Sequence, residues 1–448
     1  MRIDVVTPWY PDHASVFLGV FVQQQVTALR SKGHDVNVEV AQIFPGPPGP
    51  IPPAVHEAMH RHAAQNVDAV YPTVDGATWI PCPVPARSGF AGRADAFATG
   101  IAAKRRFLPT DGDITHAHLG VPTAAAVLDL GDHPVVVTEH QSTLDFVLDE
   151  PPARDRYREA IEQAAGFYVV AGHLRDRLIA AFGPEVTDRI DVIPNIVDLS
   201  DIAFRERDHE RLDRWIYVGA IAAHKGTKLL IEAFLHHRAN HNPHATLTIV
   251  GDGAEERWLR NQATEAGAGD AIRLLGPLPH HEIGQHLSEA DLMVHLSPAE
   301  TFGIASLEGL GAGLPVISLR NGGAEHTWGS IESIAGVLLD VGSGAPEVSD
   351  SVAELADAPQ RLDLASARRH VEVTYSASAV ADRLLAERAA DLRDVGRRVL
   401  GILCDVELPE PPAVPYLLVT NGVVSYCCRM DYGEEDFHFV EALPEYPK

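Results

Sequence analysis

In the first part of the chain, the spacing of apolar residues changes between that of a strand and that of a helix. Residues 2–8 (RIDVVTP) form a short apolar run, and residues 19–33 continue with apolar side chains at helical spacing until Gly33. Residues 34–42 return to the alternation of a strand. A strand, a helix and a second strand in this order predict a parallel sheet, because the helix provides the crossover between parallel strands.

Further apolar runs extend the same predicted sheet. They cover residues 114–119, 134–140 and 166–172. Each run is followed by a stretch with helical periodicity. The turn signal Pro194-Asn195 and the charge-dense residues 205–214 then interrupt the pattern. We therefore place a domain boundary here and assign residues 1–197 to a first Rossmann-like domain, on the acceptor side of the molecule.

The alternation of strand and helix starts again after this boundary. Residues 215–221 predict an apolar strand, residues 227–239 predict the helix that follows it, and similar pairs lead to a final strand at 315–319. A second doubly wound Rossmann-like domain is therefore expected over residues 198–365. The predicted fold class is α/β, with the two sheets facing each other across a cleft. Open α/β sheets bind ligands at the carboxyl ends of their strands, so the cleft is the expected site.

The last part of the chain differs from both predicted domains. Residues 366–403 have the pattern of an amphipathic helical region, and residues 404–448 form an acidic appended tail. Asn421-Gly422 lies between two β-rich runs in this tail, which predicts a hairpin with a type I′ turn. The proline-rich residues 45–85 are expected to shape the acceptor side of the cleft.

Composition narrows the classes of function. The 448 residues exceed what one core usually supports, and the formal charge of -26 disfavours nucleic acid partners and membrane association. Lys104-Arg105-Arg106 is interpreted as a solvated helix end. The start of the chain resembles a strand more than a signal peptide, and no apolar run is long enough to span a membrane. Four cysteines without metal or redox spacing favour a reduced, cytoplasmic setting.

Two glutamates, Glu300 and Glu308, stand before and inside a glycine-rich helical stretch. A carboxylate beside a buried helix needs a partner or a ligand. The amides of residues 301–304 open the helix and can bind an anion, while Glu308 can accept the two hydroxyl protons of a ribose. Lys225 precedes another helix at Lys225-Gly226, and the ammonium and helix amides suit a diphosphate.

Two glycine-bearing turns do not support other nucleotide sites. Residues 251–258 have the first two glycines of a dinucleotide fingerprint but Glu256 in place of the third. The turn at residues 219–228 has its glycine and lysine in the reverse of the P-loop order. These patterns therefore argue against a nicotinamide enzyme and a P-loop nucleotidase.

Several stretches, in their order along residues 1–390, resemble the motifs of the GT-B glycosyltransferases of the large retaining family 4. They read FLGVFVQQQVTALRSKGHDV, DITHAH, VVVTEHQS, VIPNIVD, YVGAIAAHKGTKLLIEAF, LTIVGDGAEERWLR, IRLLGPLP, ADLMVHLSPAETFGIASLEGLGAGLPVIS and NGGAEH. The stretch with Glu300 and Glu308 is the most specific of them. The resemblance implies transfer of a sugar from a nucleotide-diphosphate donor to an acceptor hydroxyl with retention of configuration. It implies neither a metal ion nor a cofactor.

The resemblance also implies roles for individual residues. His140 and Glu300 would lie at the reacting sugar as catalytic residues. Gly19 would approach the phosphates, Lys225 would bind the diphosphate, and Glu308 would bind the ribose. Donor-binding roles also fall on Gly219, Leu275, Leu278, Phe302, Gly303 and Ile304. Leu275 and Leu278 would flank the base, and the amides of the last three residues would complete the phosphate site.

One departure from the family pattern affects the expected donor site. Ala220 stands directly after Gly219, where family members usually have an arginine. The site therefore lacks a planar, bidentate phosphate donor, for which His224 is a candidate substitute. Two alternatives to the transferase remain open: a non-catalytic partner protein that binds sugar nucleotides, and a sugar-nucleotide epimerase on the same fold. The expected acceptor is a glycan or a small molecule.

Overall fold

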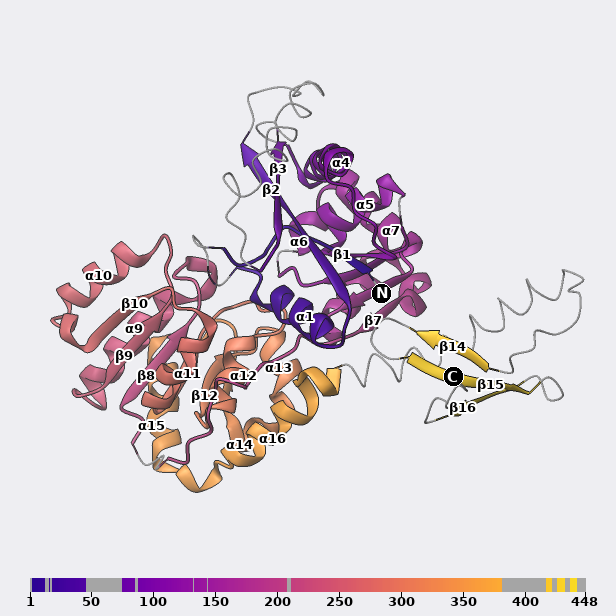
Figure 1. Cartoon of the computed structure of the whole chain (residues 1–448). Helices are drawn as coiled ribbons and strands as arrows, with labels where there is room; N and C mark the ends of the chain where they lie inside the picture. Colours follow the sequence, from indigo (N-terminus) through magenta and orange to yellow (C-terminus); the bar gives the residue numbers. More distant parts are fainter. Residues whose placement is uncertain are drawn as a thin grey trace, which may run out of the picture.

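The structure is a computed structural model with two α/β lobes and a small separate sheet (Figure 1). It describes residues 2–12, 16, 18–45, 75–84, 88–131, 133–142, 144–207 and 211–380, together with strands at 416–420, 425–431 and 436–440. Parallel strands form the centre of each lobe, and helices cover both faces. The predicted α/β class, with two Rossmann-like sheets, is confirmed.

The first lobe contains a parallel sheet of seven strands in the order β3-β2-β1-β4-β5-β6-β7. Its strands are β1 (Arg2–Thr7), β2 (Asp35–Pro45), β3 (Thr78–Val84), β4 (Ile114–His118), β5 (Val135–Glu139), β6 (Gly166–Val169) and β7 (Ile190–Val192). Its α-helices are α1 (Val20–Ser31), α4 (Phe90–Phe107), α5 (Ala125–Leu130), α6 (Leu144–Leu148), α7 (Pro151–Gln163) and α8 (Gly172–Phe182). Buried valines fill β5 on both faces, as expected for a strand covered on both sides.

The second lobe contains six parallel strands in the order β10-β9-β8-β11-β12-β13. The strands are β8 (Arg214–Val218), β9 (Thr246–Val250), β10 (Ile272–Gly276), β11 (Leu292–His295), β12 (Val316–Leu319) and β13 (Gly336–Leu339). The helices are α9 (Thr227–Asn240), α10 (Glu256–Glu265), α11 (His280–Glu289), α12 (Ile304–Gly311), α13 (Gly323–Thr327), α14 (Glu332–Ala335), α15 (Ala345–Asp357) and α16 (Leu364–Tyr375). Because β8 and β11 are neighbours, the turns after them share one edge of the sheet.

Strand β3 was not predicted from the sequence. It pairs in parallel with β2 at the edge of the first sheet and contains Pro81 and Pro83. Proline cannot donate to a neighbouring strand, so it is tolerated at a sheet edge where one side has no partner. Part of residues 45–85 is therefore regular structure, while residues 46–74 lie outside the described residues.

In the tail, where a hairpin is predicted, the structure has the antiparallel pair β14 (Tyr416–Thr420) and β15 (Ser425–Asp431). The structure adds a third antiparallel strand, β16 (Asp436–Val440). The turn at Asn421-Gly422 lies outside the described residues. Of the helical region expected over 366–403, the structure describes α16 and a helical stretch at residues 377–380.

The interpretation of Lys104-Arg105-Arg106 as a solvated helix end holds for the exposed Arg106 but was wrong for Lys104 and Arg105. Lys104 is buried, and its Nζ lies 2.8 Å from Oε1 of Glu39, a buried residue of β2. Arg105 also pairs with this carboxylate, at 2.8 Å. The two cations compensate a charge that would otherwise be costly inside the lobe. The sequence could not show this because the partners are 65 and 66 positions apart.

The two lobes are linked by contacts between residues far apart in the sequence. The amide of Val197 donates to the carbonyl of Tyr375 at 2.9 Å, where the chain passes back from the second lobe to the first. The amide of Gly172, at the start of α8, donates to Nε2 of His326 in α13 at 3.2 Å. Residues from both lobes therefore line the space between them.

Candidate active site

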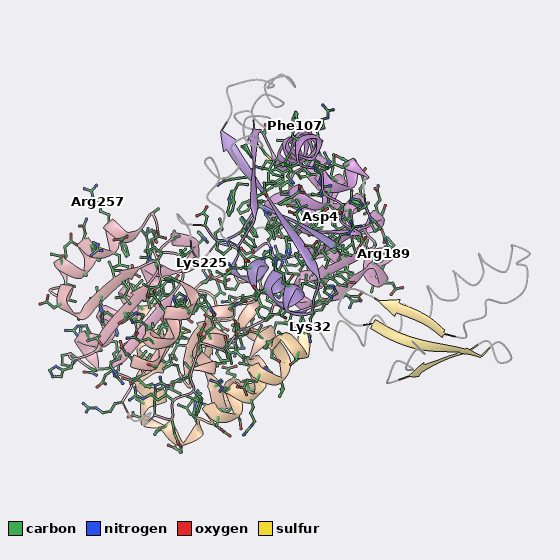
Figure 2. All side chains as sticks on the ribbon, viewed as in Figure 1. Asp4, Lys32, Phe107, Arg189, Lys225 and Arg257 are labelled. Atoms are coloured by element: carbon green, nitrogen blue, oxygen red, sulfur yellow. The ribbon has the colours of Figure 1, made fainter. Side chains whose placement is uncertain are left out.

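Glu300 and Lys225 lie together at the carboxyl edge of the second sheet. Lys225 follows β8 and Glu300 follows β11, and Nζ of Lys225 lies 2.7 Å from Oε1 of Glu300. His295, the last residue of β11, places Nε2 3.1 Å from the same oxygen. The exposed fraction is 25% for the lysine side chain and 10% for the glutamate. Lys225 therefore keeps an exposed edge at the side of its lobe toward the first lobe (Figure 2).

The surroundings of Glu300 keep its carboxylate ionised. Burial raises its pKa, but the hydrogen bond from His295 and the charge of Lys225 oppose that effect and bring the pKa to about 2. The ring of Tyr217 stacks on His295 with centroids 5.8 Å apart. This ring and the carboxylate keep the imidazole in place. The group is therefore a fixed negative charge with a cation beside it.

The turn that carries Lys225 requires glycine at two positions. Gly226 caps α9 with φ 70°, and a Cβ there would lie 1.9 Å from the carbonyl oxygen of Leu296. Gly219, at φ 152°, closes β8, and the exposed Ala220 follows it. The turn therefore passes close to the end of β11, which brings the lysine next to Glu300.

Helix α12 begins directly after this site. Phe302 is buried and packs edge-on against Tyr375 at 5.2 Å, which fixes the residue before the turn. Gly303 caps the helix with φ 81°, and Ile304 is its first residue. The first amides of a helix have no intrahelical acceptor and can bind an anion. The predicted phosphate amides therefore stand at the start of a helix, on the loop that also contains Glu300.

Glu308 lies one turn into α12, with a side chain that is 6% exposed. Its Oε1 is 2.7 Å from Nε2 of His280, the first residue of α11. Leu275, in β10, and Leu278, in the loop before α11, are partly buried against the core. Leu278 lies two residues before His280, whose side chain contacts Glu308, so the start of α11 brings Leu278 and Glu308 to the same part of the lobe.

The first lobe contributes a different group of side chains. His140 follows β5, and its Nε2 lies 2.9 Å from Nδ1 of His118 at the end of β4. The ring of Phe21 in α1 contacts His140 with centroids 4.5 Å apart. Burial, followed by the electrostatic effect of His116, lowers the pKa of His140 to about 3. His140 is therefore neutral at pH 7.

A buried carboxylate supports the backbone around His140. Glu139 accepts hydrogen bonds from the amides of Gly120 and Gln141, at 2.9 and 2.6 Å, and from the hydroxyl of Tyr157 at 2.6 Å. Burial raises the pKa of Glu139. The bonds to both flanking segments fix the direction in which His140 leaves β5.

Gly19 caps α1 with φ 76°. A Cβ at this position would lie 2.2 Å from the carbonyl oxygen of Trp9, so only glycine fits. The close approach of the two backbone segments brings the start of α1 next to the turn after β1. This agrees with a backbone that must come close to a ligand, although its contact with phosphate stays a prediction.

The sequence reasoning missed His118, His280 and His295. Each forms a hydrogen bond with a residue that the sequence did single out, namely His140, Glu308 and Glu300. His118 and His295 are the last residues of their strands, and this position was the one signal available. For His280 no spacing in the sequence indicates its partner.

Comparisons with protein families cover nearly all of the two lobes. The model of the glycosyl transferases group 1 matches residues 201–370, and the model of glycosyltransferase family 4 matches residues 18–201. The two matches follow one another without a gap. They meet at residue 201, between β7 of the first sheet and β8 of the second.

Known proteins with similar sequences include two types of glycosyltransferase. The chain is 29% identical over 336 residues to glycogen synthase of Mycobacterium tuberculosis H37Rv. This alignment covers 72% of the chain and 79% of the relative. The chain is 27% identical over 306 residues to D-inositol 3-phosphate glycosyltransferase 1 of Catenulispora acidiphila, covering 62% and 72%.

Solved structures with the same fold include Anabaena HepE in complex with UDP and glucose, with a TM-score of 0.59, 18% identity, and coverage of 87% of this chain and 100% of HepE. Sucrose-phosphate synthase of Thermosynechococcus elongatus gives a TM-score of 0.63 at 16% identity, covering 90% and 100%. At these identities the likeness establishes the fold. Within the described part of the chain, no helix is long and apolar enough to cross a membrane.

Proposed function

Because this chain belongs to the group 1 glycosyltransferases of the GT-B fold, we propose that it transfers a sugar from a nucleoside-diphosphate donor with retention of configuration. The observation that carries this proposal is the contact of Lys225 and His295 with the ionised Glu300 at the carboxyl edge of the second sheet. Donor diphosphate binds beside Lys225 and the first amides of α12. The sugar lies between Glu300 and His140.

The charges of the site suit the departure of a diphosphate. As the bond between the anomeric carbon and the diphosphate oxygen breaks, negative charge grows on that oxygen. Lys225 and the amides at the start of α12 stabilise this charge. The proposed reaction gives no part to a metal ion or a cofactor, as the family resemblance implies. Glu300 holds a sugar hydroxyl and orients Lys225.

Retention requires the acceptor to approach the face that the diphosphate leaves. The acceptor oxygen forms its bond to the anomeric carbon as the old bond breaks, and its proton passes to the leaving diphosphate. Each atom is accounted for by the two substrates. His140 supports this step as a neutral group, since it offers a hydrogen bond to a sugar hydroxyl without placing a second positive charge beside the developing oxocarbenium ion.

The first lobe is the proposed acceptor side. The histidine pair of this lobe, His118 and His140, is uncharged, and neutral hydrogen-bonding rings suit hydroxyl groups better than phosphates. The relatives' names indicate a glycan in one case and an inositol phosphate in another. We propose a glycan or a small polyhydroxylated molecule as the acceptor.

The first experiment is a thermal-shift screen with UDP, GDP, ADP and dTDP, each with and without its sugar. Wild type is compared with Lys225→Ala and with the control Lys228→Ala. Lys228 lies in α9, just after the turn that carries Lys225, but its side chain is 54% exposed and its Nζ lies 3.4 Å from Oε1 of Glu255. We expect a stabilisation by one nucleotide that Lys225→Ala removes and Lys228→Ala keeps.

The outcomes separate the proposed transferase from the two alternatives. Stabilisation followed by release of nucleoside diphosphate in the presence of an acceptor supports the transferase. Conversion of the donor to an epimer without an acceptor indicates an epimerase. Binding without turnover for any acceptor favours the non-catalytic partner, and no binding of any nucleotide contradicts the proposed donor site.

A further inference from the structure

His280 stands at a point where two predicted parts of the donor site meet. It is the first residue of α11, and its Nε2 lies 2.7 Å from Oε1 of Glu308 in α12. The two residues are 28 positions apart, so the contact exists only because the fold brings the start of α11 to α12. A hydrogen bond of this length to a carboxylate is among the stronger ones in proteins.

Glu308 depends on this contact. Its side chain is 6% exposed, and among the described residues His280 is the one side chain that donates a hydrogen bond to its carboxylate. A buried carboxylate that loses its hydrogen-bond donor is left unsatisfied in a poorly solvated place, which is costly and leaves its orientation undefined. With Oε1 held by His280, Oε2 remains for a ligand.

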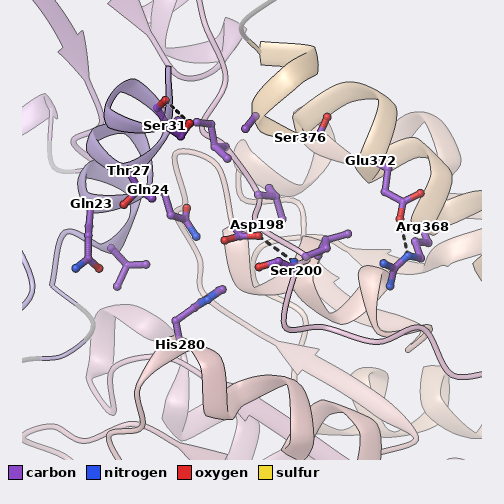
Figure 3. Close-up of a pocket in the computed structure, with 16 residues that line it drawn as sticks. Gln23, Gln24, Thr27, Ser31, Asp198, Ser200, His280, Arg368, Glu372 and Ser376 are labelled. Atoms are coloured by element: carbon purple, nitrogen blue, oxygen red, sulfur yellow. Dashed lines mark hydrogen bonds and ion pairs between the residues drawn. The ribbon is translucent and has the colours of Figure 1, made fainter. Parts of the chain in front are cut away.

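The other side of His280 faces a cavity of about 520 Å³ between the lobes. Its walls include Gln24 of α1 and Asp198, which lies in the segment that links the two sheets. Figure 3 shows His280 and Gln24 directed toward this space from opposite sides. His280 is therefore reached from the interlobe space and is not sealed inside the second lobe.

We propose that His280 is a positioning residue for the ribose of the donor. It holds the carboxylate of Glu308 in place, so that Glu308 can accept the ribose hydroxyls. This inference rests on the proposed function, because it takes Glu308 to be the ribose ligand. It adds a residue that the sequence reasoning did not identify and makes ribose recognition dependent on an imidazole.

The charges around His280 favour its protonated form. The hydrogen bond to Glu308 raises the pKa of His280, burial lowers it, and the carboxylates of Glu308, Asp198 and Asp201 raise it further. The other charged or titratable groups near it are Arg368 and Glu372 of α16, which line the same cavity, and the neighbouring His281 and Glu282. Arg368 is engaged by Glu372 at 2.7 Å, so this pair adds little net charge.

The test compares ribose with 2′-deoxyribose nucleotides by calorimetry. Affinities of UDP against 2′-deoxy-UDP, and of GDP against 2′-deoxy-GDP, are measured for wild type, His280→Ala, His280→Gln and Glu308→Gln. The exposed neighbour provides the control His281→Ala. The ratio of the two affinities within each pair measures the contribution of the 2′-hydroxyl alone, since the base and the diphosphate do not change.

We expect wild type to prefer the ribonucleotide by about tenfold, the effect of one hydrogen bond to a charged group. Glu308→Gln and His280→Ala should each bring the ratio near one. His280→Gln should restore part of it, because its amide nitrogen can donate as Nε2 does. The double variant His280→Ala/Glu308→Gln should lose no more than either single variant.

Different failures have different meanings. A ratio that falls in Glu308→Gln but not in His280→Ala overturns the role of His280 and leaves the donor site intact. A wild-type ratio near one overturns the ribose site altogether, even where Lys225-dependent binding persists. If neither UDP nor GDP binds, ADP and 2′-deoxy-ADP take their place. If no nucleotide of the thermal-shift screen binds, the proposed function fails together with this inference.

A pH series adds a readout that a purely structural role would not move. The ratio should be largest while His280 is protonated and should fall as the pH rises through its pKa. In His280→Gln the ratio should not change over the same range. A wild-type ratio that is constant or increases with pH would contradict the role of the imidazolium.

Discussion

The carboxyl edges of the two sheets carry opposite kinds of polar groups. In the second lobe, Lys225 and Glu300 form an ion pair 2.7 Å apart, and the pKa of Glu300 is about 2. In the first lobe, His118 and His140 form a neutral pair 2.9 Å apart, and the pKa of His140 is about 3. One edge therefore holds a fixed ion pair, whereas the histidine pair at the other edge is neutral. In the proposed function, the charged edge faces the diphosphate and the neutral histidine pair faces hydroxyl groups.

Burial has a different result at the two edges because the partners differ. Burial opposes the charged form of every group, so it raises the pKa of Glu300 and lowers that of His140. His295 and Lys225 outweigh burial at Glu300. His140 has no carboxylate among the causes of its shift, so burial prevails there. The nearest ionised partner, more than the depth of the site, decides the charge.

The largest expected effect of this difference is on stability at low pH. The folded pKa of His140 is about 3, below the usual 6.5, so the unfolded chain binds the proton more readily. Its contribution is present above pH 6.5 and is lost as the pH falls toward 3, by an amount on the order of 5 kcal/mol. The pKa of Glu300 is lowered from the usual 4.5 to about 2, so its contribution to stability is lost only as the pH falls through that lower range. The first lobe should therefore weaken earlier during acidification.

Urea unfolding of wild type and His140→Gln between pH 7 and 4 measures this difference. The glutamine does not titrate, so the variant should lose less stability than wild type over this range. The exposed His244→Gln provides a control whose pH dependence should match wild type. Equal slopes in all three proteins would mean that His140 is not held neutral by the fold.

Glu300→Gln removes the negative charge from the second edge. Lys225 and His295 lose their ionised partner, and the sugar loses a carboxylate acceptor. We expect turnover to fall by about 10² to 10³, as for loss of one preorganised group at a reacting centre, while the affinity for the nucleotide changes little. Initial rates and nucleotide titrations give the two quantities separately.

Glu256→Gln is a suitable control, because Glu256 is half-buried and, among the described residues, forms its ion pair with Arg260, one helical turn away in α10. Equal losses in turnover and affinity for Glu300→Gln would mean that Glu300 acts on binding as a whole. The charged edge would then differ from the neutral edge in affinity alone.

The sequence revealed more of the charged edge than of the neutral one. Glu300 and Lys225 follow apolar strands and stand near glycines, and in the structure Gly226 and Gly303 have positive φ angles. Such local patterns are visible in one dimension. The contact of His118 with His140, and that of His280 with Glu308, join residues 22 and 28 positions apart. No periodicity links these positions, because helix and strand packing alone brings them together.

Strand β3 was missed for a related reason. Pro81 and Pro83 argue against a strand in any reading of local propensity, and only the position at the sheet edge makes them acceptable. The two sheets themselves were predicted because continuous apolar strands alternate with amphipathic helices over most of their length. The fold class could therefore be predicted from a pattern that repeats along the chain. The edge strand and the side-chain partners depend on single contacts, which no such pattern indicates.

Ala220→Arg adds charge to the edge that already carries it. Ala220 is exposed after Gly219, and its carbonyl accepts a hydrogen bond from the hydroxyl of Tyr217 at 2.8 Å, so the side chain can change without loss of that bond. A guanidinium here can bind a phosphate in a bidentate manner. We expect nucleoside diphosphates to bind more tightly by about 1 to 3 kcal/mol, with a stronger dependence on salt.

Ala223→Arg separates the effect of position from that of charge. Ala223 is also exposed, lies in the same turn and would add the same charge without standing directly after the strand. If both variants tighten binding equally, the second edge attracts diphosphates through its overall field alone. If only Ala220→Arg does so, the end of β8 is a defined phosphate position. No change in either variant would place the phosphates away from this turn and would remove the charged edge from the donor site.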